Sequence, residues 1–143
     1  MGAEQNSIPS SEQSKSSLPV VLLVEDEAVV REITGEVLQA AGYHVLRSGS
    51  PREALHVASE HAGNIDLLLT DVVMPGMTGI ELAERVHDQQ PNMVTVFMSG
   101  YAEADVLRRM RATAATHLQK PFTMSMLLSR IAEALNGRAD QRA

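Results

Sequence analysis

Five short aliphatic runs alternate along the chain with segments whose apolar residues recur every three or four positions. The first run, at residues 20–24, reads VVLLV and is apolar throughout. A strand that is covered on both faces has this pattern, because neither of its faces meets water. The sequence predicts further strands at 44–47, 65–70, 93–98 and 116–119.

Helices are predicted in the segments between these strands. Ser50–Glu53 and Thr78–Glu81 have the sequence of capping boxes, which predicts that helices begin there. Two more helices are expected at 102–112 and after Thr123. The first helix is expected at 27–41, ahead of a capping glycine at position 42. Its apolar residues at helical spacing are Val29, Val30, Ile33, Val37, Leu38 and Ala41.

The alternation of strands and helices predicts the fold class and the domain limits. Strands joined by helical crossovers lie parallel, so the fold is expected to be α/β, a doubly wound five-stranded parallel sheet with five helices. The domain is expected at 19–137, followed by a C-terminal tail at 138–143. Residues 1–18 are rich in Ser, Gln and Glu, which predicts a disordered tail or linker.

Composition and charge exclude several classes of protein. The chain has 143 residues, 12 Lys+Arg against 18 Asp+Glu, and a formal net charge of −6, which argues against nucleic-acid binding. The absence of Cys excludes a disulfide scaffold, a thiolate zinc site and a cysteine nucleophile. No apolar run approaches the ~20 residues of a membrane span, and the sequence has no secretory signal, so a cytoplasmic protein without membrane contact is predicted.

Five polar residues stand at the carboxyl ends of the predicted strands. Glu25 and Asp26 follow the first strand, Asp71 the third, Ser99 the fourth and Lys120 the fifth. Ligands of doubly wound sheets bind at this edge, so these residues are expected to converge on one rim. An acid after a strand is often only a helix cap, but the other charged residues in register make the cap interpretation of Asp26 the weaker one.

The expected charge of the rim predicts a metal ion. Three carboxylates in one pocket repel each other, at a cost of about 1–4 kcal/mol for each close pair. Lys120 supplies one positive charge, and a divalent cation would supply the other two. Oxygen ligands favour Mg²⁺ or Mn²⁺ over zinc. A cleft with such a cation, a lysine and a hydroxyl is suited to phosphoryl transfer, which depends on positioning and on charge neutralisation.

Four blocks of the sequence resemble the response-regulator receiver family of two-component signalling, and are most similar to receivers attached to hybrid histidine kinases. The blocks are residues 21–26 (VLLVED), 69–79 (LTDVVMPGMTG), 98–100 (MSG) and 120–122 (KPF). They occur in the family's order and spacing. The resemblance implies a flavodoxin-like fold and a signalling module, not an enzyme, that takes a phosphoryl group from a histidine kinase or a phosphotransfer protein.

The resemblance also implies how the acidic residues divide their work. Asp71 matches the phosphoacceptor, the carboxylate nucleophile that takes the phosphoryl group. Asp26 matches a direct ligand of Mg²⁺ or Mn²⁺, and Glu25 matches an acid that often acts through water. A carboxylate oxygen of Asp71 and the backbone carbonyl of Val73 match the other protein ligands of the metal.

The remaining residues of the motif match the family's switch, with one departure. Ser99 matches the hydroxyl that turns toward the bound phosphoryl group, and Lys120 matches the ammonium that pairs with it. Pro121 matches a cis-proline position. His117 stands where the family usually has a Tyr or Phe whose ring swings inward on activation. The hypothesis is that His117 makes the switch weaker or pH-sensitive.

Two other functions stay open at this stage. One is a Mg²⁺-dependent aspartyl phosphohydrolase, although such enzymes usually have a second Asp two residues after the first, where this chain has Val73. The other is a phosphorylation-independent binding module of the same fold. The resemblance implies that the face at 102–135 changes on activation and meets partners, including a second copy in a homodimer. With no output domain after residue 137, the chain is expected to be either a stand-alone receiver or a fragment of a hybrid kinase.

Overall fold

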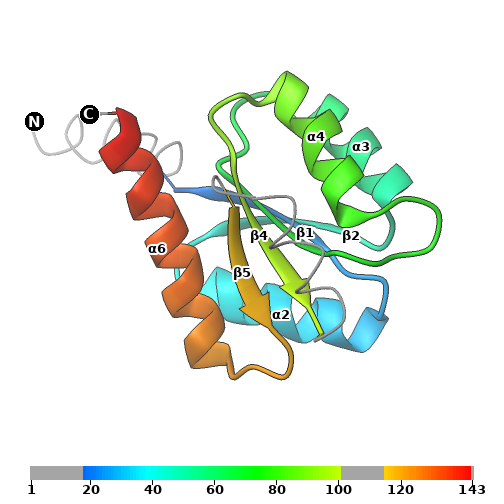
Figure 1. Cartoon of the computed structure of the whole chain (residues 1–143), viewed down its shortest axis with the longest axis horizontal. Coiled ribbons are helices and arrows are strands. Elements are labelled where there is room, and N and C mark those ends of the chain that lie inside the picture. Colours follow the sequence, from blue (N-terminus) through cyan, green and yellow to red (C-terminus); the bar gives the residue numbers. More distant parts are fainter. Residues whose placement is uncertain (1–17, 101–114, 143) are drawn as a thin grey trace, which may run out of the picture.

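The fold is a five-stranded parallel sheet with helices on both faces (Figure 1). It is seen in a computed structural model that describes residues 18–100 and 115–142. The strand order is β2-β1-β3-β4-β5, the order of a flavodoxin-like sheet. The elements are β1 (Val20–Val24), α2 (Ala28–Ala40), β2 (His44–Ser48), α3 (Pro51–Glu60), β3 (Leu67–Asp71), α4 (Gly79–Gln89), β4 (Val94–Ser99), β5 (Ala115–Gln119) and α6 (Met124–Arg142).

This arrangement confirms the predicted α/β fold class. The structure describes four helices, and the helix predicted at 102–112 lies outside the described residues. The helix α6 continues to Arg142, past residue 138 where a tail was expected, and the domain limits at 19 and 137 stay a prediction. None of the helices in the described part of the chain is long and apolar enough to cross a membrane.

The two faces of the sheet carry separate apolar clusters. Val21 and Leu23 of β1 pack in the cluster beneath α2 and α6, whereas Leu22 and Val24 pack in the cluster beneath α3 and α4 (Figure 1). All four side chains are 0% exposed. Continuous burial explains why this strand is apolar at every position, as the sequence pattern predicted.

Local sequence signals account for the starts of α3, α4 and α6. Thr78 and Glu81 form the predicted capping box at the start of α4, and Thr123 Oγ1 accepts from the Met126 N–H at 3.0 Å. The capping box predicted at Ser50 is only half present. Ser50 Oγ accepts from the Glu53 N–H, but the Glu53 carboxylate accepts from the N–H of Gly49. The reciprocal bond therefore reaches one residue further back.

Not all the apolar residues that predicted α2 face the core. Val29 is 70% exposed and Ile33 is 50% exposed. The buried face of the helix is formed by Thr34, Gly35 and Leu38. A Cβ atom at Gly35 would lie 2.2 Å from Nε of Arg47 on β2, so the absence of a side chain lets the helix lie close to that arginine. The helix therefore presents its amino-terminal apolar residues to solvent.

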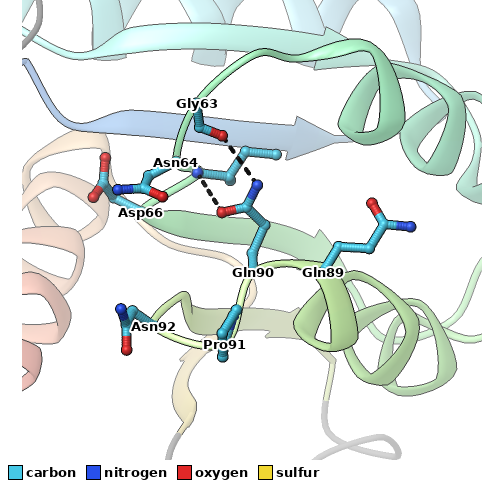
Figure 2. A pocket seen from close by; sticks show the side chains of 8 residues that line it. Gly63, Asn64, Asp66, Gln89, Gln90, Pro91 and Asn92 are labelled. Carbon is cyan, nitrogen blue, oxygen red and sulfur yellow. Dashed lines mark hydrogen bonds between the residues drawn. The ribbon is translucent and has the colours of Figure 1, made fainter.

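A polar pocket lies at the opposite edge of the sheet from the predicted rim, where β3 and β4 begin (Figure 2). Nε2 of Gln90 donates to the carbonyl oxygen of Gly63 at 3.1 Å, and Oε1 of Gln90 accepts from the N–H of Ile65 at 3.0 Å. One amide thus joins the end of α4 to the loop that precedes β3.

We expect Gln90→Ala to lower the free energy of unfolding by about 1 kcal/mol, because the partly buried N–H of Ile65 loses its acceptor. Urea denaturation measures the change. Gln89→Ala is the matched control, since Gln89 lines the same pocket but is exposed. Equal unfolding free energies for the two variants would contradict the assigned role of Gln90.

Candidate functional site

An open cleft lies at the carboxyl ends of the strands. All five of the polar residues expected at this rim line the cleft. The residues that line the cleft are Glu25, Asp26, Glu27, Asp71, Val73, Met98, Ser99, Gly100 and Lys120.

Three carboxylates of the cleft form a compact acidic cluster. One oxygen from each of Glu25, Asp26 and Asp71 lies within 4.8 Å of the others. Glu25 and Asp71 are buried, whereas Asp26 is exposed. Oxygen donors from carboxylates are the ligands that hard divalent cations prefer, so the donor set fits Mg²⁺ or Mn²⁺.

The loop between β1 and α2 holds the first two acids in place. Nη1 of Arg31 donates to the carbonyl oxygen of Glu25 at 2.8 Å, and Glu25 Oε2 accepts from the N–H of Glu27 at 3.1 Å. Glu27, not Asp26, is the N-cap residue of α2, and it makes no side-chain cap bond. The cap interpretation of Asp26 is therefore wrong, and its carboxylate belongs to the cluster. Sequence reasoning did not identify Arg31, because its contact is with a backbone atom.

Asp71 and Lys120 meet across the cleft. Nζ of Lys120 lies 2.7 Å from Oδ1 of Asp71, and the Asp71 residue is 6% exposed. Asp71 ends β3, and Lys120 follows β5 directly. The peptide bond between Lys120 and Pro121 is cis, as the resemblance implied.

Gly79 holds the segment after Asp71 close to the strand end. Its N–H donates to the carbonyl oxygen of Val72 at 2.7 Å. A Cβ atom at this position would lie 2.0 Å from the backbone oxygen of Asp71. The sequence suggested a turn and a helix start here, but the close backbone approach appears only in three dimensions.

Burial and mutual charge shift the pKa values of the cleft. Burial raises the pKa of Glu25 to about 7, against the lowering effect of the Glu27 N–H, and the charge of Asp71 raises it further. Burial also raises the pKa of Asp71, although Lys120 opposes this. For Lys120 burial lowers the pKa, but the hydrogen bond and charge of Asp71 outweigh it and the net shift is upward. All three pKa values are raised, so Lys120 keeps its proton and the cleft stabilises further positive charge.

Ser99 and His117 are joined on the side of the cleft next to β5. Ser99 ends β4 and is 3% exposed, and its carbonyl oxygen accepts from the Lys120 N–H at 2.8 Å. Its hydroxyl is hydrogen-bonded to Nε2 of His117. The backbone of His117 is in turn bound by Arg130 of α6, whose Nη1 donates to its carbonyl oxygen at 2.9 Å. Neither contact was predicted from the sequence.

Comparison with known proteins links these features to one family. Residues 21–132 match the sequence model described as the response regulator receiver domain. Over 121 residues the chain is 39% identical to the sensor kinase CckA of Brucella abortus, and this match covers 84% of the chain but only 13% of that kinase. The chain is 35% identical to the response regulator receiver protein CpdR of the same species, covering 80% of the chain and 95% of CpdR.

A solved structure gives the same result. The crystal structure of the receiver domain from the hybrid histidine kinase CckA is similar with a TM-score of 0.69 and 35% sequence identity. The similarity covers 81% of this chain and 98% of that domain. The fold and the sequence motifs therefore agree with each other.

Proposed function

Since the chain belongs to the response regulator receiver domain family, we propose that Asp71 is the residue that accepts the phosphoryl group. The protein is a phosphoacceptor signalling module of two-component systems and not an enzyme with a separate substrate. The observation that carries the assignment of Asp71 is its place in the acidic cluster together with its contact to Lys120, whose Nζ lies 2.7 Å from Oδ1 of Asp71.

The reaction follows from the chemistry of these groups. An oxygen of the Asp71 carboxylate forms a new P–O bond while the P–N bond of the donor phosphohistidine breaks, and that electron pair stays with the imidazole. Lys120 supplies a fixed positive charge beside the attacking carboxylate. Ser99 offers a hydroxyl at the same end of the sheet.

The acidic residues support a site for Mg²⁺ or Mn²⁺. Carboxylates of Asp26 and Asp71 and the backbone carbonyl of Val73 would hold the ion, with Glu25 acting through water. When bound, the ion neutralises charge on the phosphoryl oxygens. Val73 lines the cleft but offers no side-chain acid, which argues against the aspartyl phosphohydrolase alternative.

Chemical mapping tests the assignment of Asp71. The protein is incubated with acetyl phosphate and MgCl₂, and borohydride reduction then converts an acyl phosphate into homoserine at the modified position. We expect one modified residue, Asp71, and no modification when EDTA replaces MgCl₂. A reduced acyl phosphate at another acidic residue, or no uptake at all, would contradict the proposal, and absence of uptake would favour the phosphorylation-independent binding module.

Magnesium affinity is expected to rise about tenfold between pH 6 and pH 8. Glu25 has a pKa of about 7 without the ion, so it is mostly protonated at pH 6 and must release a proton when the ion binds. Calorimetric titration at the two pH values measures the change. Glu25→Gln removes the titrating group and should reduce the difference. An affinity that is equal at both pH values in the wild-type protein would overturn this prediction.

The exposed residues of α2 are proposed as the docking surface for the phosphoryl donor. Val29 and Ile33 are apolar and exposed, and they lie in the first two turns of α2, which begins two residues after Asp26 of the cleft. A protein that delivers phosphohistidine to Asp71 must cover this cleft.

We place the reaction in the cytoplasm, where protein donors receive their phosphoryl group from ATP.

The docking surface can be tested separately from the chemistry. Ile33→Asp is expected to slow phosphorylation by a histidine kinase or phosphotransfer protein at least tenfold, because a charge replaces an apolar contact. Phosphorylation by acetyl phosphate is the internal control and should stay within about twofold of the wild type. If Ile33→Asp slows both donors equally, the surface is not a docking site.

The homodimer proposed through the 102–135 face rests partly on residues that lie outside the part of the chain that the structure describes.

A further inference from the structure

The hydroxyl of Ser99 and the imidazole of His117 form a hydrogen bond beside the acidic cluster. Ser99 lines the cleft together with Asp71. In the pairing of β4 with β5, Phe97 lies opposite His117 and Ser99 lies opposite Gln119. His117 is therefore on the same face of the sheet as Ser99, two residues back along the strand direction.

The burial of Ser99 decides which partner donates in this bond. Within residues 18–100 and 115–142, Nε2 of His117 is the partner that the structure gives to the Ser99 hydroxyl. If the imidazole donated, the hydroxyl proton would lack an acceptor among those residues. An unpaired buried donor is rarer and more costly than an unused lone pair. Ser99 therefore donates to a neutral imidazole, and its proton is not available to an acceptor on Asp71.

His117 is also fixed from the side of α6. Among the strands that the structure describes, β5 lies at the edge of the sheet and pairs on one side only, with β4. Arg130 Nη1 donates to the His117 carbonyl oxygen at 2.9 Å, and Arg130 Nε lies 3.8 Å from Glu133. His117 thus connects the hydroxyl of Ser99 in the cleft to α6.

We propose that His117 is a positioning residue that holds the Ser99 hydroxyl away from Asp71 and releases it when Asp71 carries a phosphoryl group. The proposal rests on the proposed function of Asp71. A phosphoryl group brings charged acceptor oxygens into the cleft, and hydrogen bonds to charged acceptors are stronger than those to a neutral imidazole. The hydroxyl changes partner, and the contact that ties it to β5 and Arg130 is broken.

A double-mutant cycle tests this inference with beryllofluoride, which binds a carboxylate as a phosphoryl analogue. His117→Phe keeps a ring of similar size but removes the acceptor, so beryllofluoride affinity in MgCl₂ is expected to increase about three- to tenfold. His117→Gln keeps an acceptor oxygen and should stay near the wild-type affinity. His56→Phe, on the exposed face of α3, is the matched control and should have no effect.

The Ser99→Ala background separates the hydrogen bond from an effect of the ring. With the hydroxyl absent, His117→Phe should change the affinity no further. The ¹⁵N signal of His117 Nε2 should also shift when beryllofluoride binds to the wild-type protein, because the nitrogen loses its donor. An unchanged affinity in His117→Phe, or a gain that persists in Ser99→Ala, would overturn the inference. If the wild-type protein does not bind beryllofluoride, the proposed function of Asp71 fails. If the wild-type protein binds it and His117→Phe changes nothing, only the role of His117 fails.

Discussion

Asp71→Asn is expected to abolish phosphoryl uptake from both acetyl phosphate and a protein donor, a loss of at least a hundredfold. The amide has no carboxylate oxygen to form the acyl phosphate, while Lys120 and the rest of the cleft stay in place. Intact-protein mass spectrometry after incubation with either donor measures the loss.

Asp88→Asn is the matched control, because Asp88 is an exposed acid of α4 away from the cleft. It should take up the phosphoryl group like the wild type. Continued uptake by Asp71→Asn would mean that another residue is the acceptor.

Without metal, the unfolding temperature of Asp71→Asn is expected to be at least that of the wild type, because burial disfavours the charged form of Asp71.

Gly79→Ala is expected to lower the free energy of unfolding by about 2–4 kcal/mol. The added Cβ would lie 2.0 Å from the oxygen of Asp71 and 3.0 Å from its carbonyl carbon. Both atoms belong to the backbone, so no flexible side chain can move aside. The end of β3 must shift, and phosphoryl uptake should fall together with the stability. Chemical denaturation and acetyl phosphate labelling measure the two effects.

Gly137→Ala gives a control of opposite sign. Gly137 lies in α6, and a Cβ atom there would meet nothing within 4 Å. Alanine favours the helix over glycine by roughly 0.5–1 kcal/mol, so this variant should gain stability. If Gly79→Ala were as stable as the wild type, the close approach to Asp71 would not constrain the loop.

The sequence predicted the parts of this protein that follow from simple periodicity and from strand ends. Runs such as Val20–Val24 are apolar on both sides, which identifies buried parallel strands and places their carboxyl ends at one rim. The sequence pattern alone therefore groups Glu25, Asp71 and Lys120 at one rim, although they are far apart in the chain.

The contacts that escaped prediction depend on register and on backbone approach. The bond between Ser99 and His117 requires the pairing of β4 with β5, and no pattern in either strand sets that register. The orientation of α2 depends on Gly35 and Arg47, which lie in different elements. Helical spacing alone did not reveal that Ile33 points outward, because the apolar positions extend beyond one face of the helix.

The negative charge of the cleft also affects how a donor reaches it. Glu25, Asp26 and Asp71 lie together against the single positive charge of Lys120. Without a bound divalent cation, a small anionic phosphate donor in free solution meets net like-charge repulsion, with little binding energy of its own to offset it. A protein donor anchored on the proposed docking surface of α2 would gain its affinity away from that field. Until a divalent cation is bound, the same electrostatic arrangement is therefore expected to disfavour small phosphate donors, acetyl phosphate included, relative to a protein donor.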